Sequence, residues 1–103
     1  MSEFSLVYTT LPDEQKAVEI AKDLISNKLA VCANIIPNGK SVYIWEGKVD
    51  SSKEAYMLIK TDKSKLASLK DYLSKHHPYD IPAIISADAE ANQAFFDYMK
   101  KSL

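Results

Sequence analysis

Two adjacent histidines, His76 and His77, are the only imidazoles in the chain. Imidazole nitrogens suit copper, zinc and nickel, and neighbouring histidines outside a regular helix can both turn toward one ion. The same pair also suits the C-terminal end of a helix, where positive charge meets the negative end of the helix dipole. Because no HxxxH or CxxC spacing is present, the pair alone indicates either a divalent-metal site or a helix end.

Cys32 is the single cysteine and lies in an apolar run with Val31, Ala33 and Ile35. A buried cysteine usually packs as a small hydrophobic side chain. As a thiolate it is a soft-metal ligand, but a metal site needs further donors nearby. Because one cysteine forms no internal disulfide, the chain suits a reducing compartment, and we expect it to be cytoplasmic.

A second candidate site combines aromatic and charged side chains. Tyr43, Trp45, Glu46 and Lys48 follow one another around Gly47. They form either a hairpin end with a solvent-exposed ion pair or the rim of a pocket, with aromatic walls, a carboxylate and an ammonium. The sequence leaves both interpretations open.

Lys60 shares a strand face with Tyr56 and Leu58, where a lysine either extends into solvent or points into a shared cleft. An enzymatic site would have to be built from Lys60, Glu46 and Tyr79 alone. No GxSxG, P-loop, GxGxxG or zinc-ribbon spacing occurs. We therefore expect a binding protein and not an enzyme.

Strands are predicted where β-branched and aromatic residues alternate or gather. These segments are residues 4–9, 30–36, 41–46, 54–61 and 81–87, with a polar connection at 47–53. The two middle segments on either side of that connection form a hairpin.

Helices are predicted from their start and stop signals. Pro12 with the following acids begins the first helix, Asp62 caps a second that ends at Pro78, and Asn92 caps a short third. The order strand, helix, strand pair, helix, strand, helix fits two split βαβ units, with helices on one face of an antiparallel sheet.

The composition is that of one globular domain over residues 1–103, with 47% hydrophobic and 26% charged residues. The net charge of −1 and the absence of arginine disfavour nucleic-acid surfaces and phosphate-cradling enzyme sites. No apolar run approaches the roughly 20 residues of a membrane span. We expect neither a nucleic-acid nor a membrane partner.

The predicted hairpin is apolar or aromatic on both faces. Val42 and Ile44 lie on one face, and Tyr43 and Trp45 lie on the other. A monomer would expose more apolar surface than soluble monomers tolerate, unless the last helix folds over it. Because that helix is short, we expect burial against further copies of the chain.

Taken together, these stretches resemble the CutA family of divalent-cation tolerance proteins almost from end to end. The most specific stretch is Ser41-x-Tyr43-x-Trp45-Glu46-Gly47-Lys48. The other stretches are Thr10-x-Pro12-Asp13-Glu14, Leu29-Ala30-x-Cys32-Ala33-Asn34-Ile35-x-Pro37, Ile59-Lys60-Thr61 and His77-Pro78-Tyr79-x-x-Pro82.

The resemblance implies an α+β, ferredoxin-like βαββαβ sandwich with an extra C-terminal helix, assembled as a homotrimer similar to the PII proteins. It implies binding of Cu²⁺ or another divalent metal ion by His76 and His77, with Cys32 as a further thiol. Some family members carry a cysteine where Thr9 stands, so one soft ligand is missing here.

The alternative implied by the resemblance is a PII-like signalling module. Such a module binds a small molecule or a protein partner in a cleft between subunits. The residues implied to line that cleft are Tyr43, Trp45, Glu46, Lys48, Lys60 and Tyr79.

Overall fold

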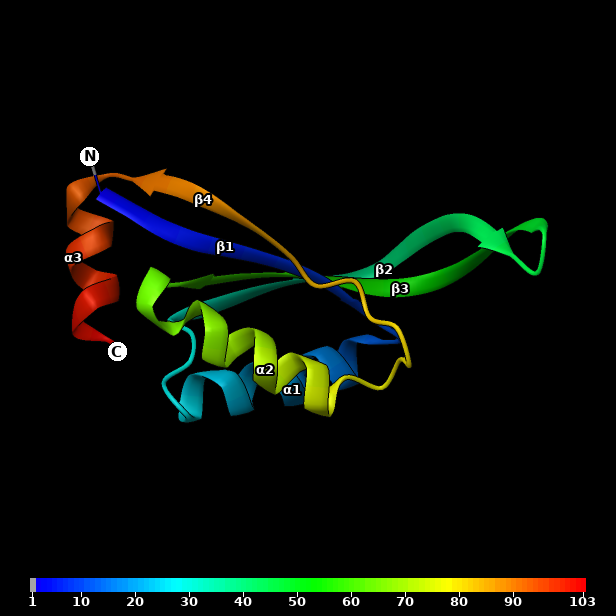
Figure 1. The fold of residues 1–103 in the computed structure, drawn as a ribbon, viewed down its shortest axis with the longest axis horizontal. Coiled ribbons are helices and arrows are strands. Elements are labelled where there is room, and N and C mark those ends of the chain that lie inside the picture. The colour runs from blue at the N-terminus through cyan, green and yellow to red at the C-terminus, as the bar shows by residue number, and fades with distance from the viewer. Residues whose placement is uncertain (1) are drawn as a thin grey trace.

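The computed structural model describes residues 2–103, which form a four-stranded antiparallel sheet and three α-helices (Figure 1). The strands are β1 (Ser2–Leu11), β2 (Cys32–Trp45), β3 (Lys48–Thr61) and β4 (Ile85–Ala91). The helices are α1 (Glu14–Ser26), α2 (Leu66–His76) and α3 (Gln93–Lys101), and a 3₁₀ turn, η1 (Lys63–Lys65), precedes α2. The strand order β2-β3-β1-β4 confirms the predicted ferredoxin-like topology with an extra C-terminal helix.

The core lies between the sheet and the helices α1 and α2, which cover one face of it (Figure 1). Alternate residues of β1 and β3 point into this layer, because successive strand residues face opposite ways. The fully buried side chains include Val7, Leu11, Met57, Ile59, Leu24, Leu69 and Leu73. At the start of α1, Asp13 accepts a hydrogen bond of 2.8 Å from the backbone N–H of Lys16, as the proline and acid signal predicted.

The segments predicted as strands at residues 30–36 and 41–46 are parts of one strand, because β2 runs through residues 37–40 to Trp45. The sequence alone leaves open whether the second segment continues straight from the first. The Pro37-Asn38-Gly39 segment forms an irregularity in the pairing of β2 with β3, where the register shifts between Ile36 and Gly39. Asn38 takes the left-handed conformation there, with φ of 58°. The bulge thus gives the ladder a bend without ending it.

Residues 48–53, predicted as a polar connection, are instead the first half of β3. Together with the far half of β2 they form a two-stranded arm, residues 40–53, that extends beyond the helices (Figure 1). No helix covers either face of this ribbon, so its polar positions do not show the alternation of a half-buried strand. The arm turns at Glu46 and Gly47, both with positive φ.

The last strand begins later than predicted, at Ile85 in place of residue 81. Pro82 has no N–H to donate and lies in the irregular segment that leads into β4. Strand β4 lies at the edge of the sheet, where it pairs only with β1, and its sequence Ser-Ala-Asp-Ala-Glu is correspondingly polar. Edge position, not side-chain pattern, makes this segment a strand.

Helix α3 does not cover the arm. It lies at the opposite end of the sheet, beside the start of β1 (Figure 1). Its Met99 is buried, and the ammonium of Lys60 lies 5.4 Å from the centre of the Phe95 ring. The apolar side chains of the arm therefore remain exposed within one chain.

Asp62 joins η1 to α3. Its carboxylate accepts hydrogen bonds from the backbone N–H of Ser64 and the ammonium of Lys100, each at 3.0 Å. These contacts, led by the hydrogen bond from the Ser64 hydroxyl and opposed by burial, lower the pKa of Asp62 to about 2. The predicted cap is therefore confirmed, although it begins the 3₁₀ turn that precedes α2.

We expect Asp62→Asn to remove a part of the acid sensitivity of the fold. Because the folded-state pKa lies below the ordinary value of 3.8, the carboxylate stabilises the fold above that pH and loses this effect as pH falls toward 2. After screening at the exposed Lys100, the contribution is about 1–2 kcal/mol. Urea unfolding at neutral and acidic pH, at one protein concentration, should show a smaller drop for the variant. An equal drop in both proteins would contradict it.

Candidate functional site

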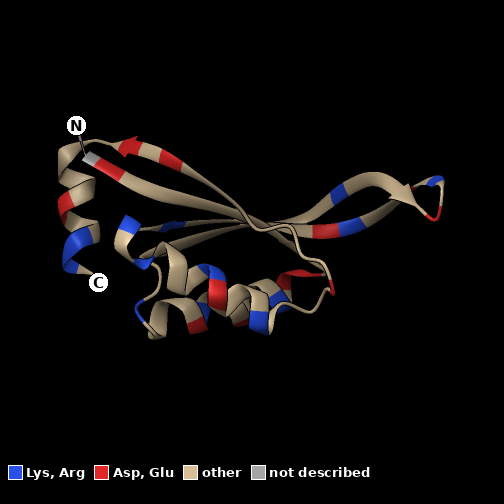
Figure 2. Cartoon of the chain, viewed as in Figure 1, with Lys and Arg blue, Asp and Glu red and all other residues tan. Residues whose placement is uncertain are grey.

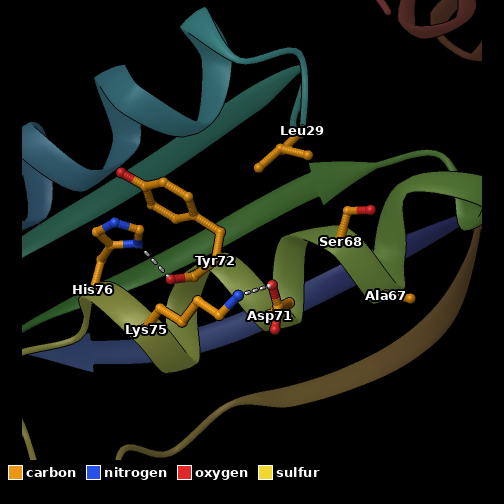
Figure 3. A pocket seen from close by; sticks show the side chains of 7 residues that line it. All are labelled: Leu29, Ala67, Ser68, Asp71, Tyr72, Lys75 and His76. Carbon is orange, nitrogen blue, oxygen red and sulfur yellow. Dashed lines mark hydrogen bonds and ion pairs between the residues drawn. The ribbon is translucent and has the colours of Figure 1, made fainter.

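His76 ends α2 at the side of a shallow groove of about 520 Å³ on the outer surface of the helices (Figure 3). Its ring stacks on that of Tyr72, with ring centres 4.1 Å apart. Its Nδ1 lies 3.0 Å from the backbone carbonyl oxygen of Tyr72. Because a carbonyl oxygen can only accept a hydrogen bond, Nδ1 must carry the proton. With the proton on Nδ1, the exposed Nε2 carries a lone pair that can bind a metal ion.

The Tyr72 ring, on which His76 stacks, is itself held in place by a hydrogen bond. The Tyr72 hydroxyl donates to the Asp23 carboxylate at 2.8 Å, and this hydrogen bond crosses from α2 to α1. Burial, followed by Asp23, raises the pKa of Tyr72 to about 12, so the phenol stays protonated. Figure 3 also shows the ion pair between Lys75 and Asp71, 3.0 Å apart, on the same outer surface.

His77 points the other way, into the protein. Its Nε2 lies 2.8 Å from the Thr10 carbonyl oxygen and 3.1 Å from the Thr9 hydroxyl oxygen. Its Nδ1 accepts a hydrogen bond of 3.2 Å from the backbone N–H of Tyr79. Both ring nitrogens therefore have partners, and burial lowers the pKa of the ring below its usual range. A metal ion would have to replace these hydrogen bonds to bind His77 in this conformation.

Cys32 lies at the start of β2, opposite Lys60 on β3. Its thiol is half-buried, and its sulfur lies 3.9 Å from the side-chain oxygen of Asn34. Across residues 2–103, no three His, Cys, Asp or Glu side chains come together in a way that would hold a metal ion. Residues 2–103 of one chain thus do not form a complete metal site. Among the three predicted ligands, His76 is the best placed to bind a metal ion.

The residues predicted to line an intersubunit cleft divide into separate places within one chain. Trp45 and Lys48 pair with each other at the tip of the arm, beside Glu46. Lys60 lies at the other end of β3, about 40 Å away at about 3.3 Å per residue. Within one chain, Lys60 and Glu46 therefore do not share a cleft.

Tyr43 and Tyr79 do meet, in a groove of about 550 Å³ on the sheet face that the helices leave open, where the arm joins the body. Its other polar lining residues are Tyr8, Thr10, Ser41, Ser52 and Glu54. The Tyr79 hydroxyl donates to the Glu54 carboxylate at 2.6 Å. This groove thus brings together two of the predicted cleft residues, Tyr43 and Tyr79, with the carboxylate of Glu54.

Glu54 is the residue of this groove that sequence analysis missed. Its position on β3 shares a face with Tyr56 and Lys60, so alternation alone placed it on the open face of the sheet. The partner residues come from β1 and from the segment after α2, and their meeting depends on the pairing of Thr10 with Tyr56. No short-range pattern in the sequence signals that register.

The helices of residues 2–103 include none that combines the length and apolar character of a membrane span. Lysines and acidic residues alternate along α1 and α2 and do not form one basic face (Figure 2).

The family profile described as CutA1 divalent ion tolerance protein matches residues 5–102 of the chain. The rice "Protein CutA 1, chloroplastic" is 38% identical over 98 residues, which cover 94% of this chain and 55% of that protein. The "Divalent-cation tolerance protein CutA" of Thermus thermophilus is 36% identical over 98 residues, covering 94% of this chain and 95% of that protein. The chain thus spans about half the length of the plant and animal relatives it matches first, and nearly all of the bacterial one.

The solved structures agree with the sequence relatives. The crystal structure of the divalent ion tolerance protein CutA1 from Ehrlichia chaffeensis superimposes with a TM-score of 0.95 at 37% sequence identity. That alignment covers 99% of this chain and 96% of the other. Similarity in fold, length and sequence therefore extends over the whole described domain.

Proposed function

Because the chain belongs to the CutA1 divalent ion tolerance family, we propose that it acts in the tolerance of divalent cations, as a homotrimer that binds Cu²⁺ or another divalent metal ion. The names of its relatives describe tolerance proteins and no enzymatic activity, and we assign no catalytic role to any residue. The cytoplasmic location stays a prediction that rests on the lone cysteine.

The observation that carries metal binding is the hydrogen bond between His76 Nδ1 and the Tyr72 carbonyl oxygen. Metal-binding histidines commonly donate their second ring N–H to a carbonyl or carboxylate, which fixes the tautomer and the ring orientation. His76 has this arrangement, and its exposed Nε2 suits copper, zinc or nickel. The remaining ligands would come from water or from a second molecule.

The exposed arm supports the homotrimer. Val42, Ile44 and Val49 share one face of it and are 68%, 65% and 74% exposed in a single chain. Trp45, on the opposite face, is 61% exposed. Soluble proteins rarely leave an apolar patch of this kind uncovered, and cyclic assembly of identical chains covers the same patch on every copy.

Calorimetric titration with Cu²⁺ tests the metal proposal. We expect binding in the micromolar range or tighter, and a loss of about tenfold or more in His76→Ala, because that substitution removes the one available imidazole lone pair. Lys75→Ala, a change on the next exposed position of the same helix, is the control and should bind like the wild type. Mass measurement in solution checks that both variants assemble normally.

A wild-type protein that binds no Cu²⁺ below the millimolar range while it assembles normally would overturn metal binding. Equal affinity in His76→Ala would reject His76 as the ligand. Titration with Zn²⁺ and Ni²⁺ in parallel identifies the preferred ion, since imidazole ligands accept all three.

A second function, the binding of a small molecule between subunits, is favoured by the groove beside the arm. Tyr43 and Tyr79 line it, and Glu54 supplies a carboxylate that is half-buried. If copies of the chain assemble through their arms, they extend its walls. This function requires a ligand chemistry that fits the groove.

A further inference from the structure

The groove at the base of the arm has one charged group and several aromatic and hydroxyl groups. Glu54 supplies the charge, and no lysine is among the described residues that line the groove. The rings of Tyr8, Tyr43 and Tyr79 contribute most of its aromatic surface. A surface of this kind is complementary to a cation and not to an anion.

The Glu54 carboxylate stays ionised at neutral pH. Burial raises its pKa, but hydrogen bonds from the hydroxyls of Ser41, Tyr79 and Thr10 outweigh burial, and the net shift is downward. Tyr79 remains a donor because burial and Glu54 raise the pKa of its phenol. The groove therefore holds a fixed negative charge that no side chain of the groove neutralises.

The single carboxylate also limits which cation fits. Glu54 is the only acidic residue among the described residues that line the groove, and one of its oxygens already accepts a hydrogen bond from the Tyr79 hydroxyl. A strongly hydrated metal ion needs several oxygen ligands with open lone pairs, preferably from more than one carboxylate. A quaternary ammonium ion needs no hydrogen-bond acceptor, because it has no N–H group and its charge is spread over carbon-bound hydrogens that contact aromatic rings and a nearby carboxylate.

Tyr79 is held in place by the buried part of the molecule. Its backbone N–H donates to His77 Nδ1, and the two rings lie with centres 4.9 Å apart. The groove wall is thus fixed before any ligand arrives, which reduces the ordering cost of binding.

We propose that this groove binds an organic ammonium ion, with its charge beside Glu54 and its alkyl groups against the tyrosine rings. The proposal deepens the small-molecule function proposed above and rests on it, while it is independent of metal binding at His76.

Choline and its uncharged isostere 3,3-dimethylbutan-1-ol test the proposal by calorimetric titration of the full chain. We expect choline to bind with a Kd below about 10 mM and the isostere at least about tenfold more weakly. Glu54→Gln keeps the shape of the side chain and removes its charge, so it should weaken choline by about tenfold. Glu19→Gln, an exposed acid on α1 outside the groove, is the control and should leave the affinity unchanged.

A second variant tests the groove independently, in case Glu54→Gln does not fold. Tyr43→Leu changes a partly exposed ring of the groove, and it should also weaken choline but not the isostere. Equal binding of choline and the isostere, or unchanged choline binding by a folded Glu54→Gln, would overturn the proposal. Displacement of choline by Mg²⁺ below the millimolar range would also overturn it and assign the groove to a metal ion.

Copper titration of Glu54→Gln separates this proposal from the metal function. Wild-type Cu²⁺ affinity together with lost choline binding supports two independent sites. Loss of Cu²⁺ binding together with choline binding would show one shared cation site and overturn the assignment to an organic ammonium.

Discussion

An Ile44→Asp variant is expected to sediment and elute as a single chain under conditions in which we expect the wild-type protein to have the mass of three chains. Ile44 is 65% exposed and lies on the same face of the arm as Val42 and Val49. Burying each such side chain contributes about 1.5–3 kcal/mol, whereas burying an unpaired carboxylate costs several kcal/mol. Because every copy carries the change, the penalty recurs at each interface of a symmetric assembly.

Light scattering coupled to gel filtration measures the effect directly. Ile25→Asp is the matched control, because Ile25 is an exposed isoleucine, 43% accessible, on α1 and away from the arm. That variant should keep the wild-type mass. If Ile44→Asp keeps the mass of three copies, or if the wild type is a single chain at all concentrations, the arm is not the assembly surface. Circular dichroism confirms that the body remains folded, since Ile44 makes no part of the core.

Replacing His77 by alanine is expected to lower the free energy of unfolding by about 2–4 kcal/mol. The ring is 9% exposed and joins three parts of the chain: the end of α2, the end of β1 and the segment that carries Tyr79. Its removal leaves a cavity and deprives the Thr10 carbonyl and the Tyr79 N–H of their partners. Urea unfolding at a fixed protein concentration measures the loss.

Two further substitutions separate the contributions of the two ring nitrogens. Glutamine can place a donor near the Nε2 position and keep the hydrogen bond to Thr10, and asparagine can place an acceptor near Nδ1 and keep the one from Tyr79. We expect each to be more stable than His77→Ala and less stable than the wild type. If His77→Ala unfolds like the wild type but loses Cu²⁺ binding, the ring is a metal ligand and its internal hydrogen bonds contribute little.

Much of the body could be predicted from the sequence, because its elements are half-buried and carry their period in their side chains. The face formed by Ala17, Ile20 and Leu24 predicted α1, and the alternation around Met57 predicted the inner half of β3. The arm could not be predicted in this way, since an exposed ribbon has no buried face to impose alternation. The Pro37-Asn38-Gly39 segment resembled a turn, and only the pairing with β3 made it a bulge.

The candidate sites were harder to predict than the fold, because they depend on contacts between residues that are far apart in the sequence. The resemblance implied that the two adjacent histidines bind one metal ion together. In the structure α2 ends between them, and His76 is exposed whereas His77 is buried. The partner that holds His77, Thr10, is 67 positions away along the chain. The intersubunit role of Tyr43, Trp45, Glu46, Lys48, Lys60 and Tyr79 stays a prediction, because its test lies in how copies of the chain assemble.

The arm also links the completion of folding to the abundance of the protein. A two-stranded ribbon without a covering layer is at best marginally stable in water, whereas the body has its own closed core. In the proposed trimer the body can therefore fold first as a single chain, and the ribbon becomes protected only when further copies arrive. Newly made chains at low concentration would then present the ribbon to proteases and chaperones, and degradation of unassembled chains would keep only complete assemblies in the cell.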